Sequence, residues 1–151
     1  MNNNPLPLNL FYYGGHRHEV DARIISARPQ YLIGNTPHGL WGEVQGYGRD
    51  WLLQDVAAFR RAGIKVIGYL TAGYEGTHSG GGLMPSWYSL EMNRKLIKNM
   101  AELDGVDGIF IDETSRYPDA ASKEYLTSLT ALIHGYGLIV WGNTGEREFD
   151  P

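Results

Sequence analysis

Two adjacent carboxylates, Asp112 and Glu113, directly follow a short apolar run at residues 109–111. An apolar run without alternation is typical of a strand inside a parallel sheet, where both faces are covered. Ionised carboxylates are very costly to bury there without a partner, so we expect both acids at the C-terminal end of the strand. Ligands and catalytic groups collect at that end of parallel strands, which makes this pair the first candidate for an active site.

The chemistry that such a pair suits best is glycoside hydrolysis. One carboxyl group protonates the departing oxygen, while the other attacks the sugar or activates water. Successive strand residues point to opposite faces, so one of the two acids must belong to the following loop. We therefore predict Asp112 and Glu113 as catalytic residues. The structural alternative is that Asp112 accepts backbone N–H groups at the strand end and that Glu113 pairs with Arg116.

Aromatic and amide side chains follow the ends of the other predicted strands. Aromatic rings stack on sugar faces and hydrogen-bond through their polar tips, with core packing as the alternative. An asparagine just beyond a strand can hold sugar hydroxyls, or it can cap its own loop. The predicted substrate-binding residues are Tyr12, Tyr13, Asn35, Tyr69, Tyr74, Tyr117, Trp141 and Asn143, and Trp87 and Tyr88 are further rings near the same edge.

A His-x-His pattern, His16 and His18, lies just after the first predicted strand. Metal-dependent barrel hydrolases can hold one metal with two imidazoles at this point, but further ligands would have to come from later strands. We predict no metal and no cofactor, and a metal-dependent hydrolase using this pair is one alternative function. The sequence has neither a phosphate-binding Gly-x-x-x-x-Gly-Lys loop nor a Gly-x-Ser-x-Gly nucleophile turn.

Five short apolar segments, each ended by Gly, Asn or Asp, alternate with four amphipathic helical patterns. In the second helix, Asp50 is the predicted N-cap and Gly63 the C-terminal stop. The predicted strands are 8–13, 31–35, 65–71, 108–112 and 138–142, and the predicted helices are 19–28, 50–62, 89–103 and 119–134.

This alternation, with right-handed crossovers, predicts a parallel α/β sheet. One candidate is an open, doubly wound sheet of five strands, which the length favours because a complete barrel usually needs about 250 residues. The other is the first five strands and four helices of a (β/α)8 TIM-type barrel. The absence of a closing helix after the fifth segment favours this second architecture. We therefore expect residues 1–151 to form a single barrel-type domain, truncated at its C-terminus.

The composition limits the partners. The chain has a net charge of -4, with 13 basic and 17 acidic residues, so it lacks the basic excess that nucleic-acid binding needs. No apolar run approaches the roughly 20 residues of a membrane span, and we expect no membrane partner. The chain has no cysteine, which leaves its compartment open. An unpaired edge of an incomplete sheet favours a homo-oligomer. A carbohydrate is the expected ligand.

Taken together, the strand ends resemble the spherulin-4 family, at landmarks from residue 8 to residue 145. These landmarks are Tyr12-Tyr13, Ile33-Gly34-Asn35, Gly68-Tyr69-Leu70-Thr71 with Tyr74, residues 107–113, and Asn143-Thr144-Gly145.

That family comprises barrel proteins that include glycoside hydrolases acting on galactosamine-containing polymers. The resemblance implies a barrel fold, a hexosamine-containing polysaccharide as substrate, and Asp112 and Glu113 as the acidic pair. The endo-α-1,4-polygalactosaminidase family is more distantly similar. The loop at residues 35–39 and Thr144 depart from the family's pattern, and a further acid from a later strand has no counterpart unless Glu146 or Glu148 substitutes. A non-catalytic carbohydrate-binding barrel protein is the other alternative function.

Overall fold

The computed structural model describes residues 10–13, 19–46, 52–53, 55–76, 85–115 and 119–143. Five strands form one sheet in which every neighbouring pair is parallel, in the order β1-β2-β3-β4-β5. The expectation of a parallel α/β fold is therefore confirmed. The strands are β1 (Leu10–Tyr13), β2 (Tyr31–Gly34), β3 (Lys65–Thr71), β4 (Gly108–Asp112) and β5 (Ile139–Gly142).

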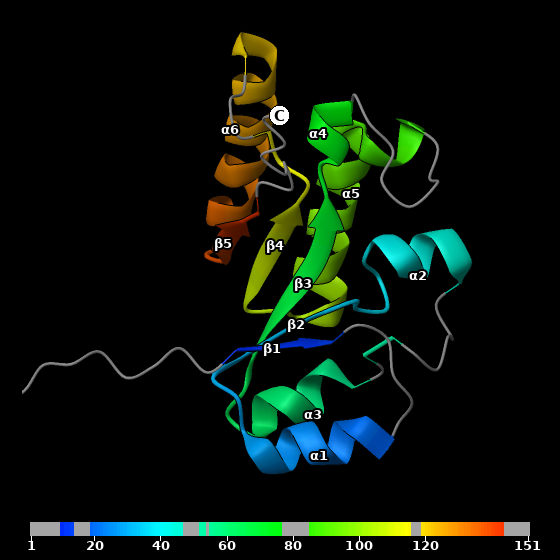
Figure 1. Ribbon diagram of the computed structural model, residues 1–151, viewed down its shortest axis with the longest axis vertical. Coiled ribbons are helices and arrows are strands. Elements are labelled where there is room, and N and C mark those ends of the chain that lie inside the picture. Colours follow the sequence, from blue (N-terminus) through cyan, green and yellow to red (C-terminus); the bar gives the residue numbers. More distant parts are fainter. Residues whose placement is uncertain are drawn as a thin grey trace, which may run out of the picture.

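The strand order excludes one of the two predicted architectures. A doubly wound sheet reverses its strand order at a switch point, so that helices cover both of its faces. Here the strands follow one another in chain order without a reversal, and right-handed crossovers then place the connecting helices on one face. Figure 1 shows the strands side by side in this order, in a strongly twisted sheet. The open doubly wound sheet is therefore wrong for this chain.

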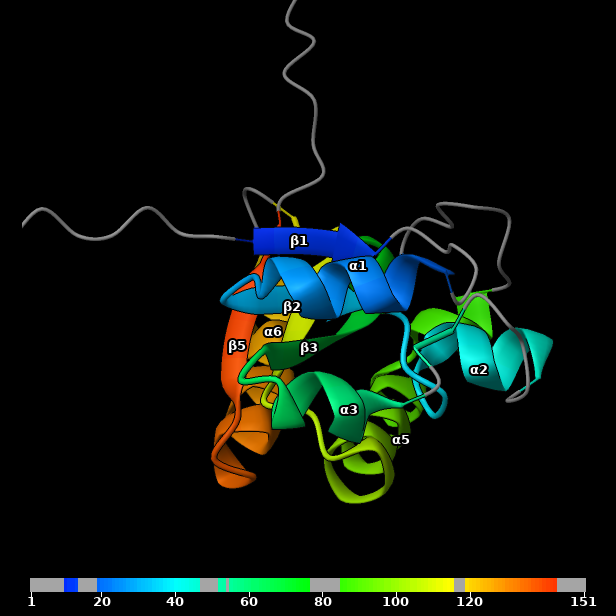
Figure 2. The same cartoon turned by 90° about the horizontal axis from the view of Figure 1, so that it is seen from below.

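The helices follow most of the predicted patterns. In the view of Figure 2, α3 and α5 lie on the same side of β3. A 3₁₀ turn, Pro85–Tyr88, precedes α5, and a π-helical turn, Met100–Asp104, follows it. The helices are α1 (Glu19–Ala27), α2 (Leu40–Gln45), α3 (Val56–Arg61), α4 (Gly73–Gly76), α5 (Leu90–Asn99) and α6 (Ala120–Gly135). No helix within these described ranges is long and apolar enough to cross a membrane.

The start of the second predicted helix is wrong. The side chain of Asp55 accepts a hydrogen bond of 2.8 Å from the backbone N–H of Ala58, which makes Asp55 the N-cap of α3. Asp50, the predicted cap, lies outside the described residues. Leu52 is buried ahead of the helix rather than on its first turn. The carboxylate of Asp55 satisfies one of the first free N–H groups, so the helix begins there, five residues after the predicted cap.

The main core lies between the sheet and the helices. Alternate strand residues such as Leu32, Val66 and Ile109 pack with apolar residues of α3, α5 and α6. The neighbouring residues Ile33 and Ile67 are also buried, but they point to the opposite face because side chains alternate along a strand. The sheet therefore has a helix-covered face and a second face with its own apolar and aromatic layer.

This second face is concave. The ring centroids of Tyr31 in β2 and Trp141 in β5 are 4.8 Å apart, in an edge contact. Two other strands lie between β2 and β5, so in a flat sheet three spacings of about 4.8 Å would hold these residues about 14 Å apart. The sheet must curve toward this face for the rings to touch. Tyr69 and Phe110 stack on the same face, with their centroids 6.0 Å apart.

Hydrogen bonds join the connection between β2 and α2 to the π-helical turn that follows α5. The backbone N–H of His38 donates to Oδ2 of Asp104 at 3.0 Å, and its Nδ1 lies 2.6 Å from Oδ1. The Asp104 side chain is only 3% exposed, so this carboxylate depends on these partners.

We expect His38→Ala to lower the free energy of unfolding by about 2 kcal/mol, because a buried acceptor loses a partner. Urea denaturation measures this. Arg61→Ala is the control: it breaks an exposed pair with Asp55, whose N···O distance is 3.4 Å, and should change the free energy by about 0.5 kcal/mol or less. Equal effects of the two substitutions would contradict a fastening role for His38.

Candidate active site

Three neighbouring strands bring polar groups together around Asp112, the last residue of β4. The hydroxyl of Tyr69 in β3 donates to Oδ2 of Asp112 at 2.9 Å. Nδ2 of Asn143, just beyond β5, donates to Oδ1 at 2.9 Å, and the backbone N–H of Glu113 donates to the same oxygen at 2.9 Å. Asp112 accepts from all three groups, as an ionised carboxylate does.

Strand register explains why these residues meet. Thr71 lies opposite Asp112, and residues 69 and 71 of β3 share a face because side chains alternate along a strand. On the other side Ile111 is paired with Gly142, which places Asn143 beside Asp112. All these side chains stand at the C-terminal ends of their strands, where the sequence predicts the site.

Glu113 is turned back over the same face of β3. Its φ of +54° is a left-handed conformation, in which a residue other than glycine is strained. Its carbonyl accepts from the backbone N–H of Tyr74 at 2.7 Å, and its Oε2 accepts from the hydroxyl of Thr71 at 2.6 Å. The prediction that one of the two acids leaves the strand is confirmed, because β4 ends at Asp112.

Both carboxylates are thus held by hydroxyl groups of one strand, Tyr69 for Asp112 and Thr71 for Glu113. Among the described residues, neither acid takes part in an ion pair. The structural alternative holds in one respect, since Asp112 does accept a backbone N–H bond. Its other half, a pair between Glu113 and Arg116, concerns a residue outside the described part of the chain.

A second carboxylate link joins the segments that follow β3 and β4. Glu75 in α4 accepts from the backbone N–H of Ser115 at 3.1 Å and also from its hydroxyl. Tyr74 and Glu75 both have left-handed backbones, with φ of +49° and +56°. Three of the strained non-glycine residues therefore gather at this edge, and strain of this kind is typical of functional sites.

Buried polar groups of α5 and α6 hydrogen-bond to the end of β3 and to one another. Nδ2 of the fully buried Asn93 donates to the carbonyl of Thr71 at 3.0 Å and to the hydroxyl of Tyr125 at 2.6 Å. The Tyr125 hydroxyl in turn donates to the carbonyl of Tyr88 at 2.7 Å.

Sequence reasoning missed Thr71, Asn93, Glu75 and Ser115. Only Thr71 carried a signal, as a hydroxyl residue at the end of a predicted strand.

The buried hydroxyl of Tyr125 predicts a loss of stability in alkali. Burial raises the pKa of this hydroxyl from 10.0 to about 12. A group whose pKa is higher in the folded state contributes stability that is complete below pH 10 and is lost as the pH rises to about 12. We expect the urea midpoint of the wild type to fall over this range, and that of Tyr125→Phe to fall less steeply. The hydrogen bond to Glu102 also raises the pKa of the exposed Tyr136 hydroxyl, and because solvent screens this site Tyr136→Phe should reduce the fall less than Tyr125→Phe does.

The structure brings some of the other predicted site residues to the two acids and places others elsewhere. Asn143 and Tyr69 meet at Asp112, and Tyr74 contacts Glu113 through its backbone. Asn35 lies half-buried after β2, and its buried Oδ1 has no hydrogen-bond partner among the described residues. Trp141 packs against Tyr31 on the concave face, two residues below Asn143.

Several predicted rings contribute differently or lie elsewhere. Tyr88 is fully buried, so it offers no stacking surface and the prediction of a ring near the ligand is wrong for it. Tyr12 and Tyr13 end β1, but their side chains are outside the described part of the structure, as is the whole of Tyr117. His16 and His18 also lie outside it. Within the described residues, no group of three or more His, Cys, Asp or Glu side chains could hold a metal ion.

No family model matches this chain. The curated proteins and the solved structures contain no match either.

Proposed function

We propose that this chain hydrolyses glycosidic bonds of a polysaccharide through Asp112 and Glu113. The observation that supports this best is the placement of two carboxylates over one face of β3, each bonded by a hydroxyl of that strand and neither in a described ion pair. Glycoside hydrolysis is the reaction that needs two carboxyl groups flanking one bond.

The proposal includes the architecture. We infer that the five strands are neighbours in a (β/α)8 barrel. Two observations support this: the uninterrupted parallel order of the strands, and the curvature that lets Tyr31 and Trp141 touch across the concave face. In such barrels, catalytic residues come from the C-terminal ends of several strands, which is where Asp112, Thr71 and Asn143 lie.

The hydrogen bonds suggest different roles for the two acids. Both lone-pair directions of Asp112 Oδ1 are taken, by Asn143 and by the Glu113 N–H, whereas Oδ2 has one described bond, from Tyr69. Asp112 is held as an anion suited to attack or to stabilise a cationic sugar. Glu113 accepts one described side-chain bond, at Oε2, and its Oε1 is left to carry a proton to the departing oxygen.

The resemblance to the spherulin-4 family leads us to propose a hexosamine-containing polymer as the substrate. Asn35 and Tyr74 are the best candidates for contacts with such a sugar. The buried Oδ1 of Asn35 has no partner among the described residues and can accept from a sugar hydroxyl or amide. Tyr74 lies beside Glu113, with a half-buried side chain.

The direct test is to incubate the full chain with galactosamine and glucosamine polymers of different degrees of acetylation. We expect new reducing ends, and oligosaccharides detectable by mass spectrometry. Asp112→Asn/Glu113→Gln should produce none while still retaining the polymer in affinity electrophoresis. Polymer binding without cleavage by the wild type would favour the non-catalytic carbohydrate-binding alternative. Loss of activity on adding a chelator would favour a metal-dependent hydrolase.

A further inference from the structure

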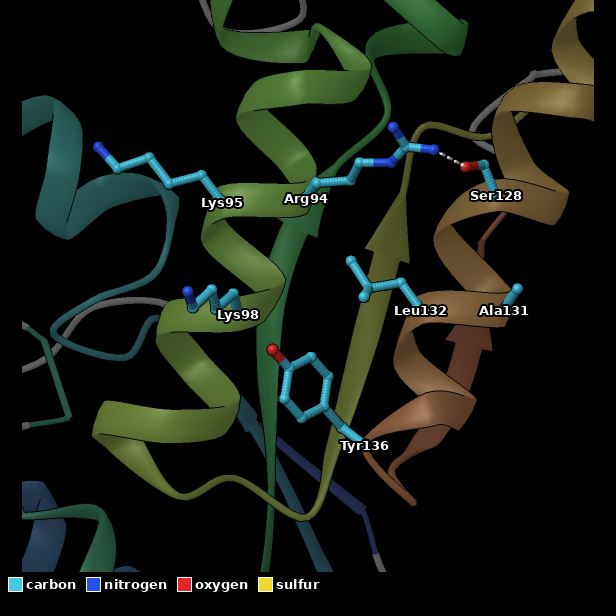
Figure 3. Close-up of a pocket in the computed structure, with 7 residues that line it drawn as sticks. All are labelled: Arg94, Lys95, Lys98, Ser128, Ala131, Leu132 and Tyr136. Atoms are coloured by element: carbon cyan, nitrogen blue, oxygen red, sulfur yellow. Dashed lines mark hydrogen bonds between the residues drawn. The ribbon is translucent and has the colours of Figure 1, made fainter.

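A groove between α5 and α6 lies outside the candidate active site. It has a volume of about 580 Å³ and is lined by Arg94, Lys95 and Lys98 from α5, and by Ser128, Ala131, Leu132 and Tyr136 from α6 and the residue after it. Figure 3 shows Arg94 reaching across from α5 to Ser128 on α6. All of the charged residues in the lining are basic, although the chain as a whole carries a net charge of -4.

Two of the three positive charges have no acidic partner among the described residues. Lys95 forms an ion pair with Glu43, at 2.9 Å. Neither Arg94 nor Lys98 occurs in an ion pair within the described ranges, and the guanidinium of Arg94 donates to a neutral hydroxyl, that of Ser128. Residues 94 and 98 are four positions apart and therefore lie on the same side of α5. This rim of the groove can accept an anion without breaking an existing ion pair.

The opposite wall supplies apolar surface. Ser128, Leu132 and Tyr136 follow one another at intervals of four residues, so they form one stripe. Leu132 is half-buried and Tyr136 is 37% exposed, which makes it one of the two large hydrophobic residues on the described surface. The Tyr136 hydroxyl donates to Glu102 at 2.9 Å, so the polar tip of this ring already has a partner.

We propose that this groove binds an acidic segment of a partner protein. Carboxylates of the segment pair with Arg94 and Lys98, and one of its apolar side chains lies on Leu132. Two cations without a described ion pair are too few to hold a phosphate backbone or a lipid surface against the net negative charge of the chain. Sugar binding needs an open aromatic face with a free polar tip. The one ring among the described lining residues, Tyr136, already has its hydroxyl bonded to Glu102, which makes a sugar a poorer ligand for this groove.

Fluorescence anisotropy with a labelled ten-residue peptide of alternating glutamate and leucine tests the proposal on the full chain. We expect binding that weakens as salt rises. The double variant Arg94→Glu/Lys98→Glu should raise Kd at least tenfold, and a peptide with serine in place of leucine should also bind more weakly. Arg61→Glu/Lys123→Glu is the matched control: it makes the same change in net charge outside the groove, and should leave Kd within about twofold.

Several outcomes would overturn the proposal. They are absence of binding at millimolar peptide, equal loss in the two double variants, tighter binding of a lysine-leucine peptide, or preferential binding of heparin or of vesicles rich in phosphatidylserine. All the substituted residues are exposed, and circular dichroism shows whether each variant is folded. Lys98→Ala, the mildest change, should raise Kd severalfold at an unchanged melting temperature. None of these results depends on glycosidase activity, so the two proposals can fail independently.

Discussion

Glu113→Gln should lower kcat for a polymeric substrate by about 10²- to 10⁴-fold, the usual contribution of a general acid or base. Glutamine retains the size of the side chain and can still accept from Thr71 through its carbonyl oxygen, but it cannot deliver a proton. The loss should therefore appear in kcat rather than in KM, because polymer binding does not need the transferred proton. Steady-state release of reducing ends measures both quantities.

The leaving group distinguishes the two acids. A nitrophenyl glycoside releases a weakly basic phenolate that needs little protonation, so Glu113→Gln should cleave its first bond at a rate close to that of the wild type. Asp112→Asn should be defective on both kinds of substrate, because it removes the negative charge that faces the sugar. Glu124→Gln, an exposed acid on α6, is the control and should retain full activity. If the two active-site variants lose activity equally on the nitrophenyl substrate, the assignment of roles is wrong.

Gly108→Ala should lower the free energy of unfolding by about 3 kcal/mol, which is the upper range for overpacking a tight site. A Cβ atom at this position would lie 2.7 Å from the carbonyl oxygen of Ile139 and 2.7 Å from Cδ1 of Ile67. Gly108 is paired with Ile139 in the sheet, so the oxygen cannot move without separating β5 from β4. Urea denaturation and the melting temperature measure the loss.

Gly135→Ala is the matched control for this substitution. Gly135 is the last residue of α6, and a Cβ atom there would meet nothing within 4 Å. Alanine in a helix is favoured over glycine by up to about 1 kcal/mol, so this variant should be neutral or slightly more stable. Equal stability of the two alanine variants would contradict the close approach of β5 to β4 at Gly108.

Local sequence signals were sufficient for the sheet and for the position of the two acids. The apolar runs that end in polar residues predict β3 and β4 with the observed bounds, since length and composition mark a buried strand on their own. They also place Asp112 and Glu113 at the C-terminal edge. Hydrophobic periodicity did not predict α2, a six-residue helix that contains Gly42. The backbone of Pro37 packs so tightly there that a Cβ atom would lie 1.7 Å from its carbonyl oxygen.

The contacts that shape the site could not be predicted, because they depend on strand register and not on sequence neighbours. Tyr69 and Asn143, both predicted to bind the ligand, have polar groups that are bonded to Asp112 from the two adjacent strands. Trp141, also predicted to bind the ligand, packs against Tyr31 through the curvature of the sheet. Each of these pairs is separated by more than thirty residues of chain.

The left-handed backbone at Glu113 sets foldability against the reactivity that we propose for its side chain. Any side chain with a Cβ atom is held there at a penalty of about 1–2 kcal/mol, which glycine would avoid. A sequence shaped only by the need to remain folded would therefore drift toward glycine at residue 113. A long acidic side chain in such a place fits the catalytic role that we propose for it, and thermostable designs that rest on that proposal should leave residue 113 untouched.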